Sequence, residues 1–291
     1  TITDEGDSGV VTVDGNLTAT TYANNGSITL NDLAVDGTIA LNTHGTGNAT
    51  VVNDAGLQFA GSTVGGNLHA TATTGNITQN NEALTITGTT TLITAASDAS
   101  ITLGTTSNAF TGALIITTND NDSGGTDGDV TIHGGTTALV LGASTIEGDL
   151  ILTSTATGAS GITNTGTLNI RGTTTVSASG VDVTLNSAAN NFQGAVAIDG
   201  LNVIVVDADN IMLAASTVTG TYTLTAGGLV QDDNSGALAI TGVTTIDAGG
   251  NVVLDIATNN FQGAVKIDGV NVTVVDAGAI DLGASTVTGT Y

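Results

Sequence analysis

Short apolar runs alternate with turn-forming residues along the whole chain. Clear examples are residues 203–206 (VIVV), 211–213 (IML) and 238–240 (LAI), each three or four residues long. Asp-Gly, Gly-Gly and Asp-Asn pairs separate such runs, as is typical of strands joined by tight turns. The pattern predicts a strand and a turn in every roughly 8 to 11 residues, with two or three strands forming one coil of about 17 to 23 residues.

An internal repeat is the clearest long-range feature. Residues 192–222 read FQGAVAIDGLNVIVVDADNIMLAASTVTGTY, and residues 261–291 read FQGAVKIDGVNVTVVDAGAIDLGASTVTGTY. The two segments lie 69 residues apart and align without a gap. Repetition on this scale indicates a solenoid, a propeller or a tandem array, in which each unit buries its apolar face against its neighbours.

Three sequence landmarks extend the repeat through the chain. A strand closed by glycine occurs at residues 9–15, 82–88, 166–172 and 236–242. The pattern Ser-Thr-(Val/Ile)-x-Gly occurs at residues 62–66, 144–148, 216–220 and 285–289. Phe-x-Gly occurs at Phe110, Phe192 and Phe261. These landmarks divide the chain into units 1–14 (partial), 15–87, 88–171, 172–241 and 242–291 (partial). Each unit is expected to hold about three or four coils.

The composition narrows the fold class. The chain has no Pro, Cys or Trp, and only 2% of its residues are aromatic. β-Sandwich arrays, propellers and membrane barrels all use more aromatic residues than this. A parallel coil needs only small and β-branched residues inside and Gly, Asn or Asp at its corners. We therefore predict an all-β chain that forms one continuous right-handed, single-stranded parallel β-helix (β-solenoid) over residues 1–291.

The charge excludes several classes of partner. The 26 acidic residues face only Arg171 and Lys266, so the net charge is −24. Nucleic-acid binding requires a basic surface, and anionic membranes repel an acidic one. No apolar run approaches the roughly 18 to 20 residues of a membrane helix. We expect no nucleic-acid partner, no membrane insertion and a capacity to attract counter-ions such as divalent cations.

The repeats resemble those of a known class of proteins. Asn-Asn-Phe-Gln-Gly-Ala-Val at residues 190–196 and 259–265, the Ala-Ser-Thr-Val-x-Gly cassette and Thr-Ala-Gly-Gly at residues 225–228 carry the resemblance. They are similar to repeats of filamentous-haemagglutinin-like exoproteins, which bacteria export by two-partner secretion, and of related autotransporter adhesins. The resemblance implies a right-handed parallel β-helix in an extracellular or cell-surface fibre. The amino-terminal secretion domain of that family is not visible in this sequence.

One acidic stretch suggests a metal site. Residues 119–129 read NDNDSGGTDGD, and oxygen ligands on a glycine-rich loop suit Ca²⁺. The candidate ligands are Asp120, Asp122, Asp127 and Asp129. Thr131 stands where an EF-hand would place its bidentate Glu. A solvated insertion loop that binds no ion is the alternative interpretation.

Other residue patterns weigh against catalysis. Some β-helices cleave polysaccharides, but such a lyase must neutralise a substrate carboxylate, and the chain offers only Lys266 and Arg171. Asp199 and Asp268 recur at one repeat position, as do Asp207 and Asp276, which favours corner turns over a unique carboxylate pair. We therefore predict that the chain is not an enzyme and carries no cofactor except a candidate Ca²⁺ ion.

Remaining side chains receive structural interpretations. The three phenylalanines that recur once per unit are expected to stack in the core or to fill coil corners, with a sugar-stacking surface as the alternative. Asn191 and Asn260, which precede two of them, are expected to form inward or corner ladders. Thr-x-Thr pairs place hydroxyl groups on one strand face and favour a hydrated outer surface, since ice-binding arrays need a stricter period.

The sequence thus favours a structural role. Tyr291 matches Tyr222, and residue 1 matches position 228, so the two ends are nearly complementary in repeat phase. We expect continuation of a longer array or end-to-end self-association, and both give a filament. The expected function is the non-catalytic shaft of an extracellular bacterial fibre or surface adhesin. The alternatives are a segment that binds Ca²⁺, a host or environmental glycan or another surface, and a polysaccharide-cleaving enzyme.

Overall fold

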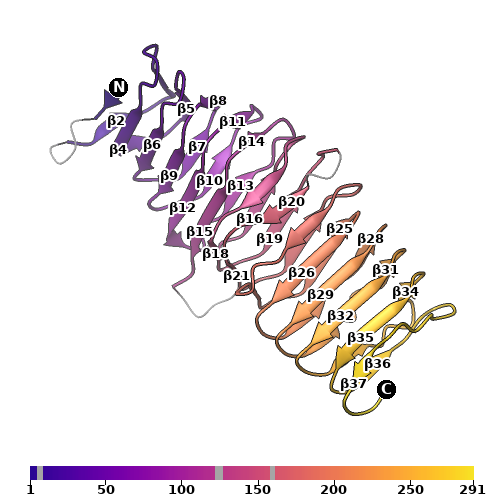
Figure 1. Cartoon of the computed structure of the whole chain (residues 1–291). Coiled ribbons are helices and arrows are strands. Elements are labelled where there is room, and N and C mark those ends of the chain that lie inside the picture. The colour runs from indigo at the N-terminus through magenta and orange to yellow at the C-terminus, as the bar shows by residue number, and fades with distance from the viewer. Residues whose placement is uncertain (5–8, 122–126, 158–160) are drawn as a thin grey trace.

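The computed structural model describes residues 1–4, 9–121, 127–157 and 161–291. Within these residues the chain contains no helix, and its strands stack in parallel in about 12 turns to form a β-solenoid (Figure 1). This confirms the predicted parallel β-helix. The described residues contain no helix that is long and apolar enough to span a membrane.

Two parallel sheets, here named sheet A and sheet B, run the length of the molecule with 18 and 19 strands, respectively. Sheet A consists of β1 (Ile2–Thr3), β2 (Val11–Val13), β4 (Ile28–Val35), β6 (Ala49–Asn53), β9 (Leu68–Ala72), β12 (Thr90–Ser97), β15 (Leu114–Asn119), β17 (Leu139–Leu141), β18 (Ser144–Ile146), β20 (Ile162–Asn164), β21 (Leu168–Ile170), β23 (Val183–Leu185), β24 (Asn191–Phe192), β26 (Val203–Asp207), β29 (Tyr222–Ala226), β32 (Thr244–Ala248), β35 (Val265–Gly269) and β37 (Thr286–Val287).

Sheet B consists of β3 (Leu17–Thr20), β5 (Thr38–Asn42), β7 (Leu57–Phe59), β8 (Ser62–Val64), β10 (Ile77–Gln79), β11 (Leu84–Ile86), β13 (Ile101–Leu103), β14 (Ala109–Phe110), β16 (Val130–His133), β19 (Leu150–Thr153), β22 (Thr174–Ser177), β25 (Val196–Gly200), β27 (Ile211–Leu213), β28 (Ser216–Val218), β30 (Val230–Asp232), β31 (Leu238–Ile240), β33 (Val252–Leu254), β34 (Asn260–Phe261) and β36 (Val272–Val274).

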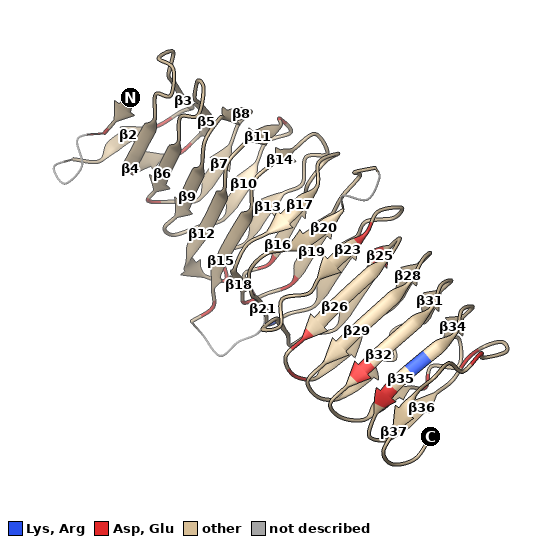
Figure 2. Ribbon diagram, viewed as in Figure 1, with Lys and Arg blue, Asp and Glu red and all other residues tan. Residues whose placement is uncertain are grey.

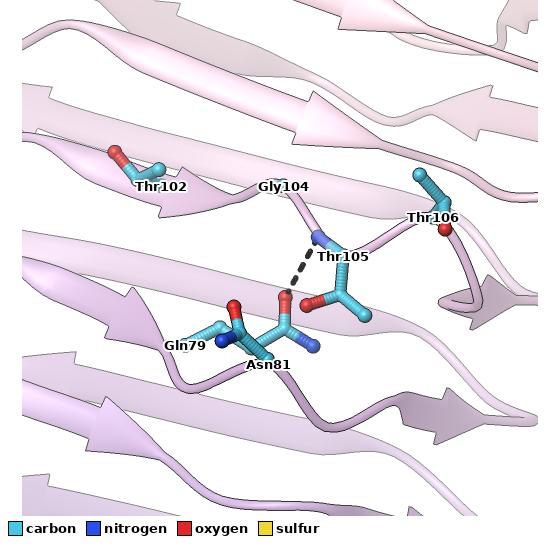
Figure 3. A pocket seen from close by; sticks show the side chains of 6 residues that line it. All are labelled: Gln79, Asn81, Thr102, Gly104, Thr105 and Thr106. Atoms are coloured by element: carbon cyan, nitrogen blue, oxygen red, sulfur yellow. Dashed lines mark hydrogen bonds between the residues drawn. The ribbon is translucent and has the colours of Figure 1, made fainter.

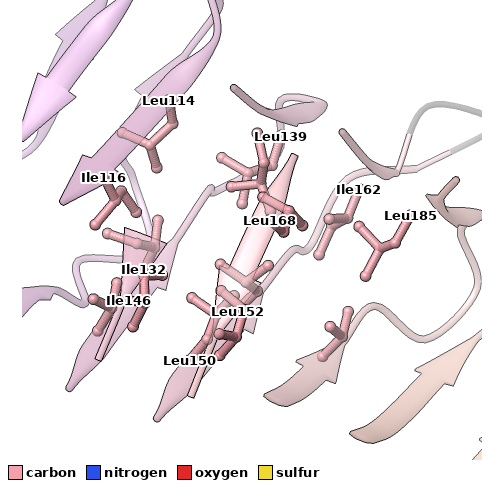
Figure 4. Close-up of a cluster of buried hydrophobic side chains, with 14 of the residues drawn as sticks. Leu114, Ile116, Ile132, Leu139, Ile146, Leu150, Leu152, Ile162, Leu168 and Leu185 are labelled. Atoms are coloured by element: carbon pink, nitrogen blue, oxygen red, sulfur yellow. The ribbon is translucent and has the colours of Figure 1, made fainter. Parts of the chain in front are cut away.

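A single aliphatic core fills the space inside the coils. Inward positions alternate with outward ones along each strand, so Leu, Ile and Val from successive coils pack on one another (Figure 4). Leu114, Ile132 and Leu152 are all completely buried. Because each coil contributes one layer, the core lengthens without becoming wider, and a chain of this size does not need a second domain.

Each sequence repeat covers three and a half coils. Strands β5, β15 and β25 occupy equivalent positions in successive repeats, because each is unbroken and pairs with two shorter strands of the next coil. β5 lies in sheet B, β15 in sheet A and β25 in sheet B. The Phe-x-Gly landmarks follow the same alternation, with Phe110 in sheet B, Phe192 in sheet A and Phe261 in sheet B. Each repeat therefore makes seven half-turns of the solenoid, so that equivalent residues of successive repeats lie in opposite sheets. The expected three or four coils per unit bracket this value.

The coils vary more in length than the sequence indicated. Register offsets run from 17 residues, between Val196 and Leu213, to 29 residues, between Ile101 and Val130. The longest coil contains the acidic stretch at residues 119–129, which is therefore an insertion relative to its neighbours. At about 4.8 Å per coil, about 12 turns span roughly 58 Å. Coils of about 17 to 23 residues would give about 13 to 17 turns and a length of roughly 60 to 80 Å.

Glycine allows the corners of successive coils to approach closely. A Cβ atom at Gly112 would lie 2.4 Å from the carbonyl oxygen of Gly88, and one at Gly88 would lie 2.7 Å from that of Gly66. The Gly88 amide donates a hydrogen bond to the same Gly66 oxygen at 2.9 Å. The other ladders of this kind are Gly148–Gly172–Gly194 and Gly220–Gly242–Gly263. In each of these ladders, the three consecutive glycines come from the three different sequence landmarks.

Replacement of buried threonines by valine is expected to stabilise the fold. Thr90, Thr174 and Thr244 stand two residues after a landmark glycine, are fully buried, and have a hydroxyl oxygen without a hydrogen-bond partner. Valine keeps the β-branched shape and removes the unsatisfied group, so each substitution should raise the free energy of unfolding by about 1 kcal/mol. Thermal and denaturant unfolding of the single and triple variants measures this gain.

A matched control lies on the same strand. The Thr94 hydroxyl donates to the Ala99 carbonyl oxygen at 3.0 Å, so Thr94→Val should lower stability by about 1 kcal/mol. Equal effects of the valine substitutions at Thr90 and Thr94 would contradict this assignment.

Candidate functional site

The repeated polar residues are the first candidates for a site, and the structure places most of them between coils. The serine of each Ser-Thr landmark lies where an unbroken strand meets a broken one. Ser216 Oγ accepts a hydrogen bond from the Ile198 amide at 2.9 Å and donates to the Ala214 carbonyl oxygen at 2.9 Å. Ser62, Ser144 and Ser285 make the equivalent bonds. This serine therefore fills a gap in the ladder of backbone hydrogen bonds.

A buried asparagine performs a similar task two coils later. Asn190 Oδ1 accepts from the Leu168 amide at 3.0 Å, and Asn259 Oδ1 accepts from the Leu238 amide at 2.8 Å. Asn108 makes the same contact to the Leu84 amide. The prediction of inward or corner ladders was made for the next residue, Asn191 or Asn260, and these two residues lie within β24 and β34 and are not buried. Because alternate residues of a strand face opposite ways, that prediction is wrong by one position.

The recurring aspartates also bind backbone amides. Asp207 and Asp276 accept hydrogen bonds from the Phe192 and Phe261 amides at 2.9 and 2.8 Å. Asp199 and Asp268 lie within β25 and β35 and accept from the amides of Thr217 and Thr286. The prediction of corner turns is wrong for Asp199, Asp207 and Asp268, because these residues lie in strands. These aspartates recur because, like the serines, they accept hydrogen bonds from backbone amides of a neighbouring coil.

Burial changes the ionisation of one of these carboxyl groups. Desolvation raises the pKa of the Asp207 carboxyl, and the nearby Asp209 charge raises it further, although the amides of Asp209 and Phe192 oppose both effects. In contrast, the amide of Gly61 and the side chain of Asn80 lower the pKa of the exposed Glu82 carboxyl. The two carboxyl groups therefore influence stability with opposite dependence on pH.

The pH dependence of unfolding can separate the two groups. Folded Asp207 binds its proton more tightly than unfolded Asp207, so its contribution is fully present below the unfolded pKa and is lost as pH rises through the folded pKa. Asp207→Asn should therefore gain stability relative to the native chain as pH rises from acidic to neutral. Glu82→Gln should lose stability relative to the native chain over the same rise in pH, because the folded state favours the ionised form of Glu82 and the variant lacks this contribution. Parallel pH profiles for the two variants would contradict both assignments.

Two of the four predicted calcium ligands form contacts within the fold. Asp120 forms an ion pair with Arg171, whose guanidinium also lies 3.7 Å from Glu147. Asp129 Oδ1 accepts a hydrogen bond from the Asp149 amide at 2.8 Å, as the corner residues of other coils do. Asp122 lies outside the described residues, and Asp127 directly follows that gap. Calcium binding at this insertion stays a prediction.

Other sequence candidates fall into structural positions. Phe110, Phe192 and Phe261 are at most 2% exposed, which confirms the expected core packing and removes the sugar-stacking alternative. In the part of the chain that the structure describes, no group of three His, Cys, Asp or Glu side chains is placed to hold a metal ion. Phe59 is equally buried. It also begins a Phe-x-Gly pattern, at residues 59–61, but this further copy lies in β7, the first strand of its pair, whereas the three landmark copies lie in the second strands β14, β24 and β34.

One surface hollow, of about 480 Å³, lies on sheet B (Figure 3). Gln79, Asn81, Thr102, Gly104, Thr105 and Thr106 line it. The Thr105 amide donates to Gln79 Oε1 at 3.4 Å, so part of the lining is already engaged within the fold. These amide and hydroxyl groups can form hydrogen bonds, but none of the lining side chains ionises near neutral pH.

Comparison with known proteins places the chain in a family of repeats. Three consecutive matches cover residues 46–117, 127–199 and 200–268 and correspond to repeats of unknown function (DUF5649). Neither the curated proteins nor the solved structures include one that matches the chain. The family repeats are close in length to the landmark units, although they begin at a different phase of the solenoid. Because these matches extend over most of the sequence, the chain belongs to the DUF5649 family of repeats.

Proposed function

We propose that this chain is the structural shaft of an extracellular bacterial fibre or surface adhesin and acts without catalysis. One observation carries the proposal. The polar residues that recur from repeat to repeat, such as Ser216, Asn190 and Asp207, form hydrogen bonds between coils of the solenoid. The residues that recur in the sequence thus hold each coil to the next, and more repeats make a longer solenoid.

Physical properties of the solenoid suit such a role. Backbone hydrogen bonds run along its axis, and a continuous core supports every coil, so bending or stretching requires many contacts to break together. The acidic surface keeps neighbouring molecules soluble through mutual repulsion. The resemblance of the repeats to those of filamentous bacterial exoproteins supports the extracellular location and the adhesin role.

Electron microscopy and cell fractionation test the proposal. Native material should appear as thin rods or fibres with an axial spacing near 4.8 Å, the separation of parallel strands. The protein should be found at the cell surface or in the medium, and protease added to intact cells should digest it. Compact globular particles, or an exclusively intracellular location, would overturn the proposal. Incubation with acidic and neutral glycans should give no cleavage products.

Calcium titration tests the alternative of an ion-binding adhesin segment. The insertion around Asp120 and Asp129 is the place to examine, with Asp129→Asn as the variant. Calorimetry that detects no heat, together with an unchanged melting temperature at millimolar Ca²⁺, would remove this alternative. A thermal shift that Mg²⁺ and added NaCl do not reproduce, and that Asp129→Asn abolishes, would favour it over a purely structural shaft.

A further inference from the structure

Two surface hollows border strand β10 of sheet B. The hollow of about 480 Å³ described above includes Gln79, the last residue of this strand. A second hollow, of about 330 Å³, is lined by residues at the beginning of β7 and β10, among them Gln58, Asn76 and Thr78. The two hollows therefore adjoin each other across one strand.

A column of polar side chains joins the two hollows. Gln58, Thr78 and Thr102 are paired in register on β7, β10 and β13. Gln58 and Thr78 line the smaller hollow, and Thr102 lines the larger one. Neighbouring strands lie about 4.8 Å apart, so the column presents one polar side chain per coil over three coils. We refer to the two hollows and this column together as the polar track.

The side chains of the polar track have spare hydrogen-bonding capacity. Gln58, Asn81, Thr102 and Thr106 are exposed, and Thr78 is partly buried. None of these five side chains forms a hydrogen bond with the described part of the chain. Amide and hydroxyl groups each offer donors and acceptors, so the chemical match is a ligand that is itself rich in hydroxyl groups.

The floor of the larger hollow is fixed by the fold. Gln79 Nε2 donates to Asn108 Oδ1 at 2.6 Å, and Asn108 Nδ2 donates to Gln79 Oε1 at 3.0 Å. Gly104 adds no side chain, and a Cβ atom there would meet nothing within 4 Å, so the hollow is open at this point (Figure 3). A lining that is already ordered loses less conformational entropy when a ligand binds.

The lining of the larger hollow does not recur with the sequence repeat. Counted from the Phe-x-Gly landmarks, residues 104–106 (GTT) correspond to residues 186–188 (NSA) and 255–257 (DIA). In contrast, the buried asparagine two residues later recurs in all three units and bonds to the neighbouring coil. The polar track is thus a local addition that the stacking of coils does not require.

The charges around the polar track narrow the class of ligand. Strands β7, β10 and β13 contain no charged residue (Figure 2). Asp36 lines the smaller hollow, and Glu82 directly follows Asn81, so an acidic residue stands beside each hollow. These carboxylates and the net charge of −24 repel anionic ligands. The larger hollow has no apolar side chain in its lining, which disfavours a lipid or an apolar peptide.

We propose that the polar track binds a neutral oligosaccharide. One hexose unit is about as long as the strand separation of about 4.8 Å, so a sugar chain that crosses β7, β10 and β13 places about one unit on each coil. The proposal rests on the proposed function, because it names the ligand class that a surface adhesin would hold. A shallow site without an aromatic platform predicts weak binding, with a Kd of the order of 1 mM.

Saturation-transfer NMR on the whole chain tests the proposal. The probes are neutral tetrasaccharides of glucose, galactose and mannose, and a tetrasaccharide of galacturonic acid is the acidic counterpart. At least one neutral probe should receive magnetisation from the protein at millimolar concentration, and the acidic probe should receive none. Thr102→Val should weaken binding of the neutral probe about fivefold, and Gly104→Asp should abolish it.

Matched variants in the next unit provide the controls. Thr184 and Asn186 hold the repeat positions of Thr102 and Gly104 and line neither hollow. Thr184→Val and Asn186→Asp should therefore leave binding unchanged, although they make the same chemical change. The following unit carries Val and Asp at these two positions, so the fold accommodates all four variants, and thermal unfolding checks this.

Each outcome decides for or against the polar track. Absence of saturation transfer to every neutral probe overturns the proposal, and so do equal losses from Thr102→Val and Thr184→Val. Equally tight binding of the galacturonic acid probe would overturn the selection of a neutral ligand. A failed saccharide test with rods still present in electron micrographs contradicts this site alone, whereas compact particles contradict the proposed shaft.

Discussion

Replacement of Gly112 by alanine should lower the free energy of unfolding by about 3 kcal/mol, the upper end of the usual cost of overpacking. A Cβ atom at this position would lie 2.4 Å from both the carbonyl carbon and the carbonyl oxygen of Gly88. The contact is with backbone, so no side-chain rotation can relieve it, and the two coils must move apart. Denaturant unfolding followed by circular dichroism measures the loss.

Gly104 provides a control in the same coil. A Cβ atom there meets nothing within 4 Å, and neither Gly104 nor Gly112 has a positive φ. Gly104→Ala should therefore be neutral or should stabilise the chain by about 0.5 kcal/mol through the lower entropy of its unfolded state. If both alanine variants lost the same stability, close packing of the glycine ladder would not be the reason for this landmark.

Removal of the Phe192 ring should lower the free energy of unfolding by about 3 to 5 kcal/mol, the usual cost of Phe→Ala in a core. Phe192 is 1% exposed and lies in the core between the two sheets, so removal of its ring leaves a cavity. Tyr22→Ala removes a similar ring from a site that is 89% exposed and should change stability by less than about 0.5 kcal/mol.

Pairs of substitutions test the half-turn in the repeat. Phe192 lies in sheet A beside Ile170, whereas its repeat equivalent Phe261 lies in sheet B beside Ile240. Phe192→Ala and Phe261→Ala should therefore act additively, and Phe192→Ala with Ile170→Ala should show a coupling of about 0.5 kcal/mol or more. Strong coupling between the two phenylalanines would mean that equivalent residues stack on one face.

Most of the fold was predictable because the sequence signals are local. Short β-branched runs, turn residues and the near absence of aromatic side chains identify a parallel coil without any knowledge of tertiary contacts. Residues that recur once per repeat are expected to have a structural role, and on this basis the phenylalanines were correctly expected in the core. Residues that act between coils were harder to predict, since their partners lie some 15 to 29 positions away, as in the contact between Phe192 and Asp207.

The contacts of two candidate calcium ligands came only from the tertiary structure. Asp120 forms an ion pair with Arg171, 51 residues away, and Asp129 accepts a hydrogen bond from the amide of Asp149 in the next coil. Proximity in the sequence does not reveal these partners, because neighbouring coils bring their own polar groups to the same corner. The charge count likewise gave the net charge but not its placement: between β5 and β24, every described acidic residue lies in a connection between strands.

By itself the sequence determined the class of the fold, the repeat and the composition of the core, because these follow from the local alternation of β-branched and turn residues. Only the tertiary structure decided the three and a half coils per repeat, since a half-turn depends on how broken and unbroken strands divide each coil. It also decided that the landmark glycines form a ladder in each unit and that the strands from β5 to β24 contain no charged side chain. These properties arise from contacts along the axis, and the linear sequence does not contain the coil register that creates them.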